Sequence, residues 1–203
     1  MNVVKKFWNT CAFKYAHLND GEGRLLRPGS PLEQIYKFHF MDVIKFEHKS
    51  LIDYGCGGGY VPRYLFEHRG LKQAFCIDIA ERSLKIAKKI LKKKNAKFYL
   101  APVRLDQFKA DILLCVACIQ HFADKKELDS FLKNANTSNV KVIILQIRSG
   151  ELSFNNAYNT GGDVGYSCVT NEPYISKALS NYKIYKLGDI LSNQYQYIIW
   201  VKK

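Results

Sequence analysis

The sequence of 203 residues lacks long apolar runs and is poor in acidic residues. No stretch approaches the length of about 18 consecutive apolar residues that a membrane-spanning helix needs. The basic first residues lack the apolar core of a secretory signal, so we predict a cytoplasmic protein without a membrane partner. Only 18 Asp and Glu residues oppose 31 Lys and Arg residues, which gives a formal net charge of +13. This excess favours an anionic partner, either a small molecule or a nucleic acid.

The six cysteines do not form the pattern of a disulfide framework or of a zinc site. Cys76 and Cys115 lie in apolar, strand-like runs, which indicates buried reduced thiols. Cys115 and Cys118 form a Cys-x-x-Cys pair, but no second cysteine pair or histidine pair follows at zinc spacing. We therefore expect no metal site.

Strand and helix patterns alternate along the chain, which indicates a single α/β domain over residues 1–203. The expected strands are 51–54, 74–79, 97–100, 111–117, 140–147, 182–187 and 195–201, and the expected helices are 31–44, 60–68, 81–94 and 124–134. The last two strands are too close in sequence for a helical crossover, so we expect them to pair antiparallel.

Two further segments are candidates for covering a site. Residues 1–30 either form a lid or an N-terminal helix that packs on the sheet edge. Residues 149–173 form a long polar insert after the fifth strand, and long loops of this kind often serve as binding loops. We expect this insert on the substrate side.

The strongest local signal is the strand 51–54, which runs directly into a glycine loop. From Asp53 to Gly59 the sequence reads Asp-Tyr-Gly-Cys-Gly-Gly-Gly. Glycines suit a backbone that turns tightly and approaches a ligand without Cβ atoms, and the Asp53 carboxylate can pair with an ammonium group. A dinucleotide-binding loop is the alternative, but the spaced third glycine of Gly-x-Gly-x-x-Gly is replaced by Tyr60.

This stretch resembles the glycine loop of the class I S-adenosylmethionine-dependent methyltransferases, which commonly reads Asp-x-Gly-Cys-Gly-x-Gly. The resemblance covers residues 51–147 and the final strand pair. It implies a Rossmann-like α/β fold, with a seven-stranded, mostly parallel sheet, an antiparallel last strand and helices on both faces. It also implies S-adenosylmethionine as cofactor, S-adenosylhomocysteine as its product, and cofactor binding by Asp53, Gly55, Cys56 and Gly57.

Asp78 ends the second strand and is placed to bind two vicinal ribose hydroxyls with its two carboxylate oxygens. Ile79 follows it and is assigned to the same part of the cofactor. An acid has this role in dinucleotide enzymes as well, and a helix N-cap before Glu81 is a further alternative.

The adenine site departs from the family pattern. Many members of the family carry an Asp directly after the third strand, but none stands there in this sequence. Adenine is therefore expected against Val103 and Arg104, with Asp106 as a less direct candidate.

The stretch from Cys115 to Phe122 resembles the family's segment at the end of the fourth strand. The resemblance implies that the backbone at Val116 and Ala117 lines the methionine end of the cofactor and that His121 lies near the methyl donor. His121 is then a candidate general base, because the unperturbed pKa of imidazole is about 6.5. The alternative is a histidine that caps or orients the loop.

The methyl acceptor is predicted from charge and from missing motifs. The candidate substrate residues are Arg148, just past the fifth strand, with Arg24, Arg27 and Tyr15 in the lid segment. The chain lacks the Asp/Asn-Pro-Pro-Tyr/Phe motif of the enzymes that methylate nucleobase amino groups. We predict O-methylation of a small polar, anionic metabolite, such as a surface-polysaccharide or phosphate-ester precursor. An RNA methyltransferase that uses the basic face 85–97 and a non-catalytic cofactor-binding subunit are the alternatives.

Overall fold

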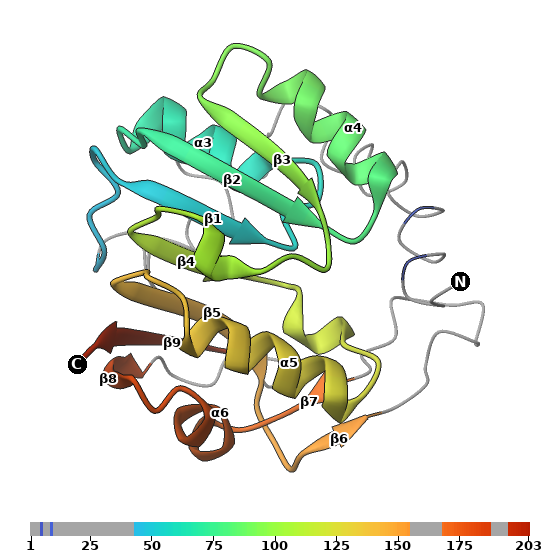
Figure 1. Ribbon diagram of the computed structural model, residues 1–203, viewed down its shortest axis with the longest axis vertical. Coiled ribbons are helices and arrows are strands. Elements are labelled where there is room, and N and C mark those ends of the chain that lie inside the picture. The colour runs from blue at the N-terminus through green and yellow to red at the C-terminus, as the bar shows by residue number, and fades with distance from the viewer. Residues whose placement is uncertain (1–4, 6–8, 10–42, 155–167, 188–194) are drawn as a thin grey trace. The chain divides into compact units, whose positions relative to one another are not determined.

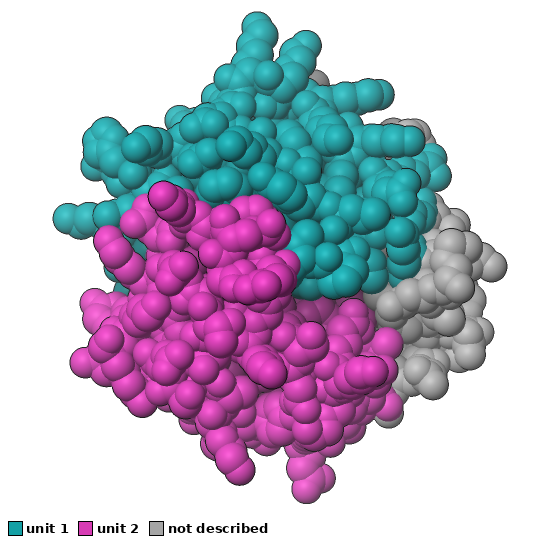
Figure 2. Space-filling model, viewed as in Figure 1, with its two compact units in different colours: residues 1–103 teal, residues 104–203 magenta. Residues whose placement is uncertain are grey.

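The computed structural model describes residues 5, 9, 43–154, 168–187 and 195–203 (Figure 1). The principal strands form one seven-stranded mixed sheet with the order β3-β2-β1-β4-β5-β9-β8. The chain separates into two compact units, residues 1–103 and 104–203, which Figure 2 shows in different colours. The predicted α/β fold with an antiparallel last strand is confirmed.

The first unit is built on three parallel strands and two described α-helices. These are β1 (Ser50–Tyr54), α3 (Tyr60–His68), β2 (Gln73–Asp78), α4 (Glu81–Ile90) and β3 (Ala96–Leu100). Leu51 and Ile52 of β1 are fully buried, as are Cys76 and Ile77 of β2. Helix α4 packs against β2 and β3 with a buried face that includes Leu84. The apolar runs in the sequence therefore form the core of this unit.

The second unit combines parallel and antiparallel strand pairs. Its longer elements are β4 (Ile112–Cys115), α5 (Lys125–Asn136), β5 (Val142–Arg148), α6 (Glu172–Ala178), β8 (Tyr182–Leu187) and β9 (Tyr195–Lys202). Its short elements are η3 (Leu105–Gln107), η4 (Ile119–His121), β6 (Ser153–Phe154) and β7 (Cys168–Val169). Strand β5 pairs in parallel with β4 and antiparallel with β9. The predicted pairing of the last two strands is antiparallel, as expected.

Side-chain caps begin the two described α-helices of the second unit. The Asp124 carboxylate accepts a hydrogen bond from the backbone N–H of Glu127 at 2.8 Å. The Glu127 carboxylate in turn accepts the backbone N–H of Ala123 at 2.8 Å, one residue before the N–H that the reciprocal bond of a capping box usually uses. Asn171 caps α6 through the N–H of Tyr174.

Several elements differ from the expectation. Helix α4 ends at Ile90 instead of residue 94, because the chain must turn back before Ala96 pairs with Ala74 of β2. Strand β4 ends at Cys115 instead of residue 117, because Ala117 has a left-handed backbone. Helix α6 was not predicted. The expected helix 31–44 lies outside the described residues except for 43 and 44, which are not helical.

Candidate functional site

The glycine loop after β1 is fastened to the end of β2 by backbone hydrogen bonds. The N–H groups of Gly55 and Cys56 both donate to the carbonyl oxygen of Ile77, at 2.8 and 3.0 Å. The N–H of Gly59 donates to the carbonyl of Cys56 at 2.9 Å, and α3 begins directly afterwards. These bonds hold the loop as a fixed turn between strand and helix.

The loop glycines meet two different requirements. Gly55, Gly57 and Gly59 all have positive φ angles, of 82°, 52° and 79°, a region that other residues occupy at a cost of about 1–2 kcal/mol. A Cβ on Gly59 would lie 3.1 Å from the Cβ of Ala87, so this glycine also allows close packing against α4. A Cβ on Gly57 would meet no atom within 4 Å. The backbone at Gly57 thus presents an open face on which a ligand can lie.

Asp78 joins the glycine loop to the start of α4. Its Oδ2 accepts the N–H of Gly57 at 2.8 Å, and its Oδ1 accepts the N–H of Ala80 at 2.8 Å. Burial raises the pKa of this carboxyl, and the backbone donors oppose that shift. Ala80 rather than Asp78 occupies the N-cap position of α4. The N–H of Ile79 also acts on this carboxyl, and a carboxylate with about four acceptor positions then still has capacity for a hydroxyl donor.

Asp53 is a buried carboxyl of the site whose loss of hydration is not offset by hydrogen bonds to both of its oxygens from the described residues. It is 4% exposed, and its Oδ2 has no hydrogen-bond partner among the residues that the structure describes. Burial, with a smaller contribution from the charge of Asp78, raises its pKa to about 8. A nearby cation would lower this pKa and stabilise the carboxylate. The position is therefore suited to a positively charged group of a ligand.

Cys56 contacts a second thiol beneath the loop. Its side chain is buried, and its pKa is raised by a hydrogen bond with the Cys76 thiol and by burial. Its Sγ lies 3.6 Å from the carbonyl oxygen of Gly57. Both cysteines are free thiols, as the sequence predicted for Cys76. In this site Cys56 serves as a small buried packing residue.

Two residues of the N-terminal segment contact the beginning of α4. The Asn9 carboxamide oxygen accepts the backbone N–H of Arg82 at 3.2 Å, and Lys5 pairs with Glu81 at 3.4 Å. Because Ala80 offers no side-chain cap, Asn9 satisfies one of the unpaired N–H groups of this helix. The rest of the predicted lid 1–30 lies outside the described residues.

The residues expected near adenine differ in exposure. Ile79 and Val103 are half-buried, whereas Arg104 is exposed. The Arg104 guanidinium donates from Nε to Oδ1 of Asp106 at 3.1 Å, and this pair lowers the pKa of the Asp106 carboxyl. Asp106 is thus already paired with a cation, which weakens its case as an adenine ligand.

In the second unit, the segment after β4 makes a sharp turn. Val116 is buried, and Ala117 is exposed with a φ of 52°. His121 lies at the end of η4 with 7% exposure, and burial lowers its pKa to about 4. A general base works best with a pKa near the operating pH. Neutral His121 is therefore a weak base in this state, which favours the alternative of an orienting histidine.

The predicted substrate residues are only partly visible. Arg148 ends β5 and is half-buried, and its carbonyl accepts the N–H of Thr170 at 2.9 Å. Tyr15, Arg24 and Arg27 lie outside the described residues.

No group of three or more metal-ligating side chains occurs within the part of the chain that the structure describes. In the same part, no helix has the length and apolarity to cross a bilayer.

Sequence reasoning missed one buried polar pair. Gln146 of β5 accepts the N–H of Ala117 at 2.8 Å through Oε1 and donates to the Tyr197 hydroxyl at 2.9 Å through Nε2. The sequence does show a lone glutamine within an apolar strand. Because a buried amide needs hydrogen-bond partners, this residue indicates a buried polar interaction. The pairing itself joins residues 51 positions apart and was not readable from local pattern.

Comparisons with known proteins agree with this geometry. A family model described as a methyltransferase domain matches residues 52–138. No curated protein matches the chain.

Three solved structures illustrate the similarity of fold. Magnesium protoporphyrin IX methyltransferase from Synechocystis, solved with bound S-adenosylhomocysteine, is 15% identical with a TM-score of 0.68, and 99% of this chain and 98% of that chain are covered. A methyltransferase in complex with the Trm112 activator from Haloferax volcanii is 10% identical, with a TM-score of 0.70 and coverage of 98% and 97%. A TehB-like methyltransferase from Corynebacterium glutamicum is 13% identical, with a TM-score of 0.65 and coverage of 96% and 99%.

The buried carboxyl of Asp53 predicts a pH-dependent stability. Its folded pKa of about 8 lies above the ordinary value of 3.8 for an aspartic acid, so the folded state binds more protons between these values. Stability of the ligand-free protein should fall as pH rises from about 4 to 8, and Asp53→Asn should remove this loss. We expect the variant to gain at least about 1.4 kcal/mol relative to wild type on going from pH 5 to pH 8. Urea unfolding at both pH values measures this, and parallel wild-type and variant profiles would contradict it.

His121 predicts the opposite dependence at lower pH. Because burial lowers its pKa from 6.5 to about 4, the unfolded state binds more protons between these values. Stability should fall as pH drops from about 6.5 to 4, and His121→Gln should flatten this acid limb. Thermal unfolding across this range is the measurement, with exposed His68→Gln as the matched control. If the two variants show equal acid limbs, burial of His121 does not have the predicted effect.

Proposed function

Since the chain belongs to the class I S-adenosylmethionine-dependent methyltransferase family, we propose that it methylates an anionic oxygen of a small polar molecule. We propose the position of the cofactor from one observation. The backbone at Gly57 has an open face, and the two buried carboxyls of Asp53 and Asp78 belong to the same site. The acceptor is inferred from the net charge of +13 and from the low basicity of His121.

We assign the cofactor's groups to residues of the described chain as follows. Gly55, Cys56 and Gly57 supply the backbone against which it lies. The free lone pairs of Asp78 accept the ribose hydroxyls beside Ile79. Asp53 takes the ammonium group, because that cation offsets the cost of its buried charge.

Three further assignments extend the cofactor site. Val103 supports the adenine ring, and Arg104 flanks it. Val116 and Ala117 supply backbone groups to the methionine end. These assignments rest on the position of the residues in the loops that follow β3 and β4, because ligands of α/β sheets bind at the carboxyl ends of strands.

S-adenosylmethionine supplies a methyl group on a positively charged sulfur, so the protein's main task is to align the acceptor with that group. Neutral His121 suits an acceptor oxygen that is already ionised, such as a carboxylate or phosphate ester, because no proton then has to be removed. His121 acts as a hydrogen-bonding group toward the acceptor. Arg148 binds the acceptor's negative charge.

The N-terminal segment serves as a lid over this edge. Lys5 and Asn9 contact Glu81 and Arg82, which lie three and four positions after Asp78 in the sequence. The cap that Asn9 provides ties the segment to the same end of β2 to which the ribose is assigned. The insert 149–173 is proposed to enclose the acceptor, and the single domain over residues 1–203 stays a prediction.

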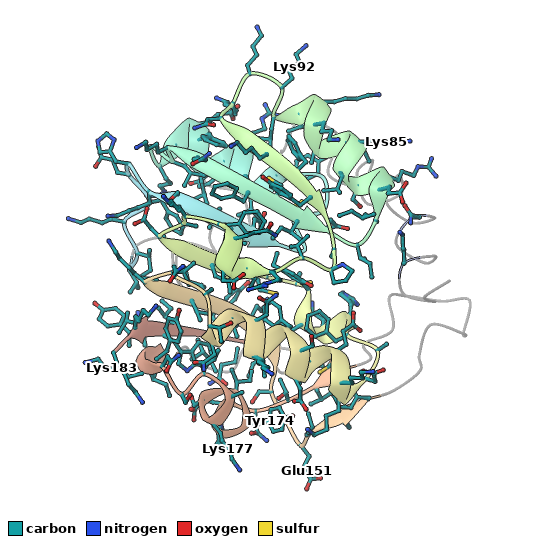
Figure 3. All side chains as sticks on the ribbon, in the orientation of Figure 1. Lys85, Lys92, Glu151, Tyr174, Lys177 and Lys183 are labelled. Atoms are coloured by element: carbon teal, nitrogen blue, oxygen red, sulfur yellow. The ribbon has the colours of Figure 1, made fainter. Side chains whose placement is uncertain are left out.

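An exposed lysine surface favours RNA as a second candidate acceptor. This α4 lysine surface consists of the exposed residues Lys85, Lys88, Lys89, Lys92, Lys93 and Lys97. Lys85 and Lys92 project outward from α4 and from the turn that follows it (Figure 3). Lys88 also lies over the ring of Phe98 at 6.0 Å, so an aromatic side chain does adjoin the lysines. Such a surface can follow a phosphate backbone.

Gly57→Ala tests the cofactor site. The added methyl group meets no atom of the described residues within 4 Å, so beyond the strain of an alanine at a φ of 52° its effect should fall on a ligand that lies on this backbone. We expect affinity for S-adenosylhomocysteine to fall at least tenfold, equivalent to about 1.4 kcal/mol, measured by calorimetry. Gly70→Ala is the control for backbone strain, because Gly70 has a similar φ of 65° outside the glycine loop, although its Cβ would also lie 3.1 Å from Cγ of Glu47. Equal affinities in wild type and Gly57→Ala would remove this backbone from the cofactor site.

Charge reversal on the α4 lysine surface separates the two acceptor classes. The variant Lys88→Glu/Lys89→Glu/Lys92→Glu should leave methyl transfer to a small acceptor unchanged, because these lysines have no part in that site. With S-adenosylmethionine labelled in its methyl group, we expect label in the small-molecule fraction of a metabolite extract with both proteins. Label in RNA that disappears with the triple variant, together with steeply salt-dependent RNA binding by wild type, would favour the RNA acceptor instead.

A further inference from the structure

Gln146 is a buried amide in β5, a strand whose other buried residues are all apolar. Its neighbours Leu145 and Ile147 are fully buried, and its own side chain is 9% exposed. Burying an amide without partners is costly, but both ends of this one are used, at 2.8 Å to Ala117 and 2.9 Å to Tyr197. From this geometry we infer that Gln146 is a positioning residue for methyl transfer, which acts by holding the backbone of Ala117.

The backbone of Ala117 is the part that needs to be held. With a φ of 52°, it is one of two non-glycine residues with positive φ among the described ranges, the other being His48. An alanine in this conformation is strained, and such strain persists only where the surroundings impose it. The Ala117 side chain is exposed, so its packing contributes little. The bond from its N–H to Gln146 Oε1 is the direct restraint.

The turn at Ala117 sets the direction of the segment that follows. Strand β4 ends at Cys115, and η4 begins at Ile119, so only three residues connect the strand to the 3-10 helix. The N–H of His121 then donates to the carbonyl of Cys118 at 2.9 Å. A change in the Ala117 backbone would therefore shift both the groups assigned to the methionine end and the position of His121.

Tyr197 fixes the orientation of the glutamine amide. Its ring is buried in β9, which pairs with β5 so that Gln146 and Tyr197 are register partners. An amide whose Nε2 donates to this hydroxyl must present Oε1 to Ala117. The two strands together thus aim one acceptor at one backbone N–H. The inference rests on the proposed function, in that Val116 and Ala117 are taken to line the cofactor site.

Gln146→Met removes this restraint while retaining most of the side-chain volume. We expect the variant to bind S-adenosylhomocysteine roughly three- to tenfold more weakly, the scale of one neutral hydrogen bond. Tyr197→Phe should cause a smaller loss of about two- to threefold, because Gln146 then keeps its acceptor but loses its orientation. In the Gln146→Met background, Tyr197→Phe should cause no further loss of affinity.

Tyr182→Phe is the matched control. Tyr182 is a buried tyrosine of the same unit, and its hydroxyl donates to the carbonyl of Val140 at 2.9 Å. Its loss should lower the unfolding temperature without changing cofactor affinity. Gln146→Glu should bind more tightly than Gln146→Met, because its side chain can still accept the Ala117 N–H and meet the Tyr197 hydroxyl.

The outcomes separate this inference from the proposed function. If wild type fails to bind S-adenosylhomocysteine, the assignment of the cofactor site is wrong. If wild type binds but Gln146→Met binds equally well, the positioning role is overturned. Protein labelled with ¹⁵N-alanine gives a readout independent of the cofactor, since the Ala117 amide should exchange faster with solvent in Gln146→Met. An unchanged exchange rate would likewise overturn the inference.

Discussion

The carboxylate of Asp78 is the constraint on which the binding edge of the first unit depends. Its two oxygens hold Gly57 and Ala80 at 2.8 Å each, so one side chain joins the loop after β1 to the start of α4. Hydrogen bonds to an ionised acceptor are roughly twice as strong as neutral ones, and a glycine loop cannot restrain itself through side chains. With Asp78 in place, the open face at Gly57 has a defined orientation before any ligand arrives. The same carboxylate has further acceptor capacity for hydroxyl donors. It can therefore hold the loop and bind a ligand at the same time.

Asp53 shows the cost of preparing such an edge. A carboxyl that is 4% exposed, beside a second acid, has its pKa raised to about 8 and does not stabilise the empty protein as a charged group. An apolar or amide side chain would serve the fold better at this position. Residues that break a local rule of stability in this way are expected at functional sites. Among the described residues nothing bonds to Oδ2, and the cofactor's ammonium group is the cation that we propose offsets this cost.

Local patterns in the sequence predicted the strands and the glycine loop because their causes are local. The run from Leu51 to Gly59 contains both the apolar strand and the residues that allow its turn. Asp124 and Glu127, three positions apart, indicate the start of α5. The pKa of His121 was not predictable, since it depends on burial by residues distant in sequence. The partnership of Gln146 with Tyr197 depends on the register of two antiparallel strands, which no local pattern specifies. The early end of β4 has a similar origin, because a left-handed alanine gives no compositional signal.

The distribution of charge is consistent with the chemistry of methyl transfer. A protein with a formal charge of +13 nevertheless buries two carboxyls at one edge of its first unit. In the proposed assignment one of these carboxyls, Asp53, meets the cofactor's ammonium group, whereas the proposed anionic acceptor would be attracted by the remaining basic surface. Transfer of a methyl group from a sulfonium to an oxyanion removes one positive and one negative charge, and a water-poor site favours a reaction in which charge disappears. An acceptor that arrives ionised needs no strong base, and burial of His121 removes basicity that such a reaction does not use.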